Sequence, residues 1–164
     1  MKNFIFFCCL LLAAGNASAQ QQNVIPVNTC QEYIRTVASG HIKLADFEIS
    51  DQNQNTIHLT LRSNKNEFVW FIKLPSLGYC IKSSDRVYFT FEGGQSYSAI
   101  MLDPINCKGE ITYELKNKEN KALLNAFLTK RFTHLRIYSE HKSFLSTVSI
   151  PTGNRILDVF NCLR

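Results

Sequence analysis

The stretch FTFEGGQSYSAIM (residues 89–101) sets two glycines between two runs of alternating apolar residues. Adjacent glycines can cradle a phosphate where the chain runs on into the N-terminus of a helix. Here the chain runs on into a second β-pattern, so Gly93 and Gly94 are predicted to turn a β-hairpin. A three-residue loop that begins at Glu92 matches the two faces best, because it sets apolar residues opposite one another. The predicted pairs are Phe91, Phe89 and Val87 with Gln95, Tyr97 and Ala99.

The hairpin also predicts how the cysteines pair. Strands that leave the two glycines bring Cys80 within one residue of facing Cys107, and a bulge can absorb the mismatch. Cys30 is then expected to pair with Cys162, because the first opens the first predicted helix, the second closes the last, and domain termini often lie close together. The gaps of 50, 27 and 55 residues between the four cysteines disfavour a zinc site, which needs two close pairs.

Residues 1–19 have the pattern of a signal peptide. A positive start is followed by the apolar run FIFFCCLLLAAG (4–15) and by the small residues ASA (17–19). The apolar run is shorter than the roughly 20 residues that span a bilayer. We therefore expect cleavage after Ala19 and an exported protein, periplasmic or extracellular, with residues 20–164 as a single disulfide-braced domain and no membrane span.

Apolar periodicity predicts an α+β fold that is mainly antiparallel β-sheet, sandwich-like and rich in hairpins. A capping box at Thr29 and Glu32 opens a short helix that ends at Gly40. A shift in the apolar pattern at Ala45 predicts a bulge in the first strand. Strands are expected over 42–50, 56–62, 67–74, 86–91, 95–102, 110–115, 132–139 and 144–150, and further helices over 117–130 and 152–164.

Charge is distributed unevenly along the chain. Residues 20–114 carry 8 basic and 10 acidic side chains, a net charge of −2, whereas residues 115–164 carry 9 basic and 3 acidic ones, a net charge of +6. A basic region of this kind favours an anionic partner, either an envelope component or another exported protein. The alternative is that these are ordinary solvated charges. The candidate anion-binding surface comprises Lys130, Arg131, Arg136 and Lys142.

No catalytic, cofactor-binding or metal-binding residues are predicted. The histidines form no H-E-x-x-H pattern, and no serine lies in G-x-S-x-G. The composition favours a non-catalytic binding or accessory module without a nucleic-acid partner. An inhibitor or immunity-type protein that neutralises a secreted enzyme or toxin is the second hypothesis, and an enzyme with dispersed site residues is the third.

Six short motifs in the second half of the chain resemble a group of small exported proteins of unknown function that is common in Bacteroidota. The motifs are GYC (78–80), FTFEGG (89–94), NCKG (106–109), ITYEL (111–115), LRIYS (135–139) and FNCL (160–163). EHKSF (140–144) departs from the group, where an Asp-Gly or Glu-Gly turn is usual. The resemblance implies an exported α+β or sandwich-like domain and brings no catalytic residues with it.

Overall fold

The computed structural model describes residues 27–37, 41–65, 67–75, 80–82, 85–99, 105–116, 118–138 and 143–164. The predicted signal peptide lies outside these ranges. Within them, none of the helices has the length and apolar character needed to cross a bilayer.

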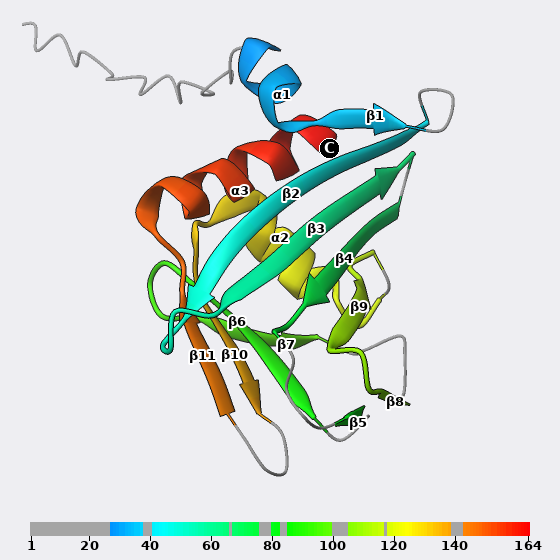
Figure 1. Ribbon diagram of the computed structural model, residues 1–164. Coiled ribbons are helices and arrows are strands. Elements are labelled where there is room, and N and C mark those ends of the chain that lie inside the picture. Colours follow the sequence, from blue (N-terminus) through cyan, green and yellow to red (C-terminus); the bar gives the residue numbers. More distant parts are fainter. Residues whose placement is uncertain are drawn as a thin grey trace, which may run out of the picture.

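One nine-stranded antiparallel sheet dominates the fold, in the order β7-β6-β10-β11-β2-β3-β4-β9, with β1 paired to β2. It curls into a nearly closed, barrel-like sheet whose two ends are β7 and β9 (Figure 1). β5 and β8 form a separate pair. The predicted fold class is confirmed. The strands are β1 (Arg35–Val37), β2 (Ile42–Asp51), β3 (Thr56–Asn64), β4 (Glu67–Lys73), β5 (Ile81–Lys82), β6 (Arg86–Phe91), β7 (Ser96–Ala99), β8 (Ile105–Asn106), β9 (Glu110–Glu114), β10 (Phe132–Tyr138) and β11 (Ser143–Thr147), and the helices are α1 (Val27–Tyr33), α2 (Lys121–Thr129) and α3 (Ile150–Leu163).

The central hairpin has the predicted register. Phe89 faces Tyr97 and Val87 faces Ala99, and the Phe91 N–H donates to the carbonyl of Gln95. Gly93 and Gly94 have φ angles of +86° and +80°, which favour glycine because a Cβ is strained there. The glycines therefore turn the chain, as the sequence predicts.

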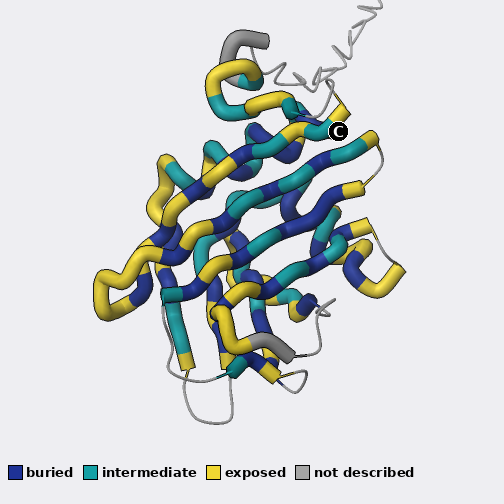
Figure 2. Tube along the Cα trace, turned by 45° about the vertical axis from the view of Figure 1, so that its right-hand side comes forward, coloured by how far each residue is buried: buried dark blue, intermediate teal, exposed yellow. Residues whose placement is uncertain are grey.

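Inner and outer residues alternate with a period of two along β2, β3 and β6, as the colouring of Figure 2 shows, whereas β4 buries three successive residues, Phe68, Val69 and Trp70. The inner residues pack against α2 and α3, which lie on the same side of β2, β3 and β4 (Figure 1). Phe127 of α2 stacks on Phe160 of α3 with ring centroids 4.7 Å apart, and both rings contact Trp70 of β4. The helices thus fill the concave side, and the outer face of the sheet is left to solvent.

Three local predictions are wrong. The first helix begins at Val27, so Thr29 and Glu32 lie within it and do not open it. It ends at Tyr33 instead of continuing to Gly40, because residues 35–37 leave it and pair with the start of β2 as strand β1. β2 has no bulge at Ala45, since its pairing with β3 is unbroken. In the last two cases a tertiary strand pairing overrides the local pattern.

Both disulfides join the cysteines that the sequence pairs. Cys30 bonds to Cys162 and so ties α1 to α3, and Cys80 bonds to Cys107. The pairing of Ile81 with Asn106 is offset by one residue from the register of the central hairpin, and this offset sets Cys80 directly opposite Cys107.

Candidate functional site

The outer side of β7, β6, β10 and β11 forms a regular grid, because the four strands pair in continuous register from His134 of β10 onward, beyond a register shift between Phe132 and His134. One row runs Ser96, Thr90, His134, Thr147 and the next runs Ser98, Tyr88, Arg136, Leu145. A third row holds Arg86, Tyr138 and Ser143. We call these residues the arginine face. It carries two arginines and several hydroxyls, and none of its members is acidic.

A groove of about 650 Å³ lies on the arginine face. Its volume is in the range of sites that bind small molecules. Every residue that lines it belongs to the grid: Tyr88, Thr90, Ser96, His134, Arg136, Tyr138 and Leu145.

Arg136 is held in place by an aromatic neighbour on its own strand. Its Nη1 donates a hydrogen bond of 2.8 Å to the Tyr138 hydroxyl, and its guanidinium lies 5.6 Å from the centre of that ring. Tyr138 in turn meets Tyr88 edge to face, with centroids 5.7 Å apart. Arg136 forms no ion pair with a carboxylate of the described residues, so its remaining N–H donors are available to a ligand.

His134 is oriented by a short chain of hydrogen bonds. The Thr133 hydroxyl donates to the Thr90 carbonyl at 3.0 Å, and His134 Nδ1 lies 3.1 Å from the same Thr133 hydroxyl oxygen. Which atom donates in the bond between the hydroxyl and Nδ1 depends on the tautomer of the ring. These contacts fix the ring of His134 beside Arg136 at the groove.

The outer side of β2, β3, β4 and β9 differs in its charges, and we call it the paired-charge face. Its cross-strand neighbours include Glu48 with His58, 3.2 Å apart, and Lys73 with Glu110, 3.8 Å apart. A hollow of about 680 Å³ lies over it and is lined by Lys73, Glu110 and His58 among others. Charges of both signs therefore line this second hollow.

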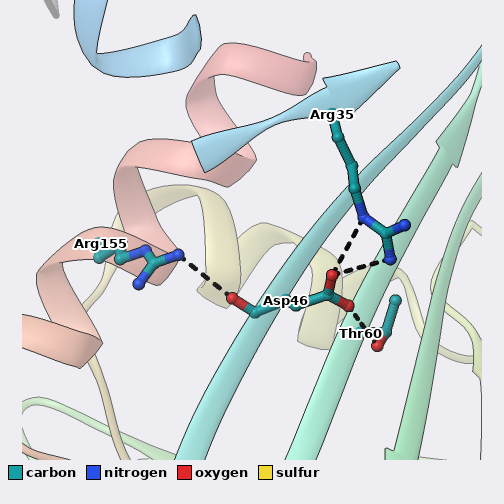
Figure 3. A network of polar contacts seen from close by, with 4 residues as sticks. All are labelled: Arg35, Asp46, Thr60 and Arg155. Carbon is teal, nitrogen blue, oxygen red and sulfur yellow. Dashed lines mark hydrogen bonds and ion pairs between the residues drawn. The ribbon is translucent and has the colours of Figure 1, made fainter. Parts of the chain in front are cut away.

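Asp46 makes several polar contacts on the paired-charge face. It accepts from Arg35 at 2.8 Å and from the Thr60 hydroxyl at 2.7 Å, while its backbone carbonyl accepts from Arg155 at 3.2 Å (Figure 3). β1 and β11 cover the two ends of β2, and Arg155 of α3 reaches its edge between them. The guanidinium of Arg155 also stacks on Tyr33, 4.2 Å from the ring centre.

The predicted anion-binding surface is only partly assembled. Arg136 lies on the arginine face. Lys130 and Arg131 lie instead beside the turn of the central hairpin, where Lys130 donates to Gln95 and Arg131 pairs with Glu92 at 3.0 Å. Lys142 lies outside the described residues.

Sequence reasoning missed Arg86, Tyr88 and Tyr138 as neighbours of Arg136. The alternation of apolar and polar residues was the available signal. It places Arg86 and Tyr88 on the polar face of one strand, and Arg136 and Tyr138 on the polar face of another strand. What the sequence does not show is that β6 pairs with β10, which sets Tyr88 opposite Arg136. The site depends on this long-range pairing.

Other polar groups offer less for chemistry. Within the described ranges, no cluster of three or more His, Cys, Asp or Glu side chains is placed to hold a metal ion. Tyr113 is fully buried, and burial, together with the nearby Asp85, raises the pKa of its phenol. It therefore stays protonated at any physiological pH.

No family model, curated protein or solved structure matches this chain. The resemblance to small exported proteins of Bacteroidota therefore stays a prediction, and the function has to be argued from the geometry of the arginine face.

Proposed function

We propose that this protein is an exported, non-catalytic binding module whose arginine face takes an anionic ligand. The observation that carries the proposal is the presence of Arg86 and Arg136 on a face whose described residues include no acidic side chain. Neither arginine pairs with a carboxylate of the described residues. An anion that enters the groove therefore does not have to displace a carboxylate of these residues.

The chemistry of the guanidinium suits this role. Arginine presents planar, paired N–H donors to a carboxylate or phosphate, and such charge-assisted hydrogen bonds contribute about 1.5–3 kcal/mol each. Tyr138 fixes Arg136 before the ligand arrives, which lowers the conformational entropy lost on binding. The wider +6 charge of residues 115–164 adds long-range attraction, although among the polar side chains that the structure describes in that region only Arg136, His134 and Tyr138 line the groove.

The test is retention of the purified, oxidised protein on a carboxylated matrix during a rising salt gradient. We compare Arg86→Gln/Arg136→Gln with Arg62→Gln/Lys73→Gln, which removes the same number of positive charges from the paired-charge face. Arg62 is a close match for Arg136, since it also stacks on an aromatic ring, 5.3 Å from the centre of Phe71. The first variant should elute at clearly lower salt than the second. Equal elution of the two variants would overturn the proposal.

A further inference from the structure

We infer that the anionic ligand is a carboxylated saccharide, that is, an oligosaccharide that contains hexuronate units. The inference rests on the proposed function and adds the class of ligand to it. It comes from the groups that surround the two arginines, which suit a ligand with many hydroxyls as well as a negative charge.

The groove combines hydrogen-bond donors with groups that can also accept. A carboxylate offers acceptors only, so a site made for a carboxylate alone needs donors only. Here the groove is lined by Arg136, which only donates, and by His134, whose ring nitrogens can donate or accept. Thr90 and Ser96 share a hydrogen bond of 2.7 Å, and each hydroxyl can both donate and accept. Sugar hydroxyls, which also donate and accept, match such groups, whereas the carboxylate of an acidic peptide only accepts.

Two tyrosines, Tyr88 and Tyr138, line the groove. Tyr138 is 43% exposed although it is a large aromatic residue, and Tyr88 stands edge-on to it. A pyranose ring has an apolar face of C–H groups that packs on an aromatic ring, with its hydroxyls directed sideways to hydrogen-bonding partners. The exposed ring of Tyr138 gives the groove such a surface.

The spacing of Arg86 and Arg136 suits an extended ligand with more than one carboxylate. Arg86 and Arg136 lie on adjacent strands at diagonal positions, where side chains are about 7–8 Å apart. Two such arginines can contact two carboxylates of one extended oligosaccharide. Among the described residues, Leu145 is the one aliphatic side chain that lines the groove, so an acyl chain finds few aliphatic contacts with them. The groove therefore favours the saccharide over an anionic lipid.

The experiment is isothermal titration of the oxidised protein with three probes. These are tetragalacturonate, its fully methyl-esterified and therefore neutral form, and tetra-aspartate, which has similar charge without sugar rings. We expect tetragalacturonate to bind at least tenfold more tightly than either of the others. Equal binding of tetra-aspartate would overturn the saccharide but leave the anionic ligand standing. Equal binding of the neutral ester, or no binding of any probe, would overturn the proposed function as well.

Substitution of Tyr138 separates stacking from charge. Tyr138→Leu should weaken tetragalacturonate about tenfold and tetra-aspartate much less, and Tyr138→Phe, which keeps the ring, should recover most of the loss. Equal weakening of both ligands by Tyr138→Leu would mean that the ring only positions Arg136, and the stacking argument would fail. Because Tyr138 is exposed, these variants should fold, and circular dichroism checks that they do.

Discussion

The two outer faces of this sheet are built from the same strand geometry and differ in what stands opposite several of their charges. On the paired-charge face, Glu48 meets His58 and Lys73 meets Glu110 across adjacent strands. On the arginine face, Arg136 stands between Tyr88 and Leu145, and Arg86 stands opposite Tyr138. In the Lys73–Glu110 ion pair the two charges neutralise each other locally. The second arrangement leaves positive charge for a ligand, so we expect local pairing, more than net charge, to decide where an anion binds.

Both faces depend on one core and two disulfides, and removal of a disulfide is the largest expected effect. On a chain-entropy model, loss of the Cys30–Cys162 bond costs up to about 5 kcal/mol and loss of the Cys80–Cys107 bond up to about 3.5 kcal/mol. Paired Cys→Ala variants followed by denaturant unfolding measure both values. A larger loss from the Cys80–Cys107 pair would contradict the ordering.

Neither disulfide contributes a residue to the arginine face. Binding of anions should therefore persist in each Cys→Ala variant under conditions where the variant stays folded. Loss of binding by a folded variant would show that the two regions are coupled.

Leu145→Glu should introduce an ion pair with Arg136 on the arginine face. Leu145 stands directly opposite Arg136, so a carboxylate there would occupy the guanidinium and repel an anion. We expect affinity for a carboxylated ligand to fall at least tenfold. Leu145→Gln has the same size without the charge and should reduce affinity much less. Equal loss in the two variants would assign the effect to the lost leucine side chain.

Asp51 lies at the junction between the two faces, because it pairs with Ser146 where β11 meets β2. Substitution of Asp51 tests this junction. Burial by itself raises the pKa of Asp51, but hydrogen bonds from Asn55 and Asn53 outweigh burial, so its pKa lies below the ordinary value. A depressed pKa stabilises the fold above the unfolded value of about 3.9, and this contribution disappears as the pH falls through the folded value.

The wild type should therefore exceed Asp51→Asn in unfolding free energy at neutral pH. The difference should shrink as the pH falls below about 4. Chemical denaturation at several pH values measures it. A difference that stays constant or grows with acid would contradict this role of the carboxylate.

Asp46→Asn should have the smallest effect. Both partners of its ion pair with Arg35 are more than half exposed, so the loss of unfolding free energy should stay below about 1 kcal/mol. The change also leaves Arg35 without its carboxylate, so retention on the carboxylated matrix should rise slightly. A fall in retention would contradict the view that pairing hides the positive charge of this face.

The parts of this fold that are local in sequence could be predicted. The central hairpin and the Cys80–Cys107 bond follow from two glycines and the alternation around them, and the Cys30–Cys162 bond then follows by elimination. The neighbours β6 and β10 could not be derived, because the pairing of Phe89 with Leu135 spans a helix and several other elements. The same limit explains the error at residues 35–37, where a helical pattern yields to pairing with β2. For the same reason the sequence predicts Arg136 as a binding residue but does not predict its neighbours Tyr88 and Arg86 on β6.

The most direct test of the central claim is to map where an anionic ligand binds. In a titration of ¹⁵N-labelled protein with tetragalacturonate, the amide signals of Thr90, His134 and Arg136 should shift with a common affinity, and those of Glu48, Thr60 and Lys73 should stay in place. Shifts concentrated on β3 and β4, with β6 and β10 unaffected, would show that the charges of the paired-charge face bind the ligand and would contradict the account.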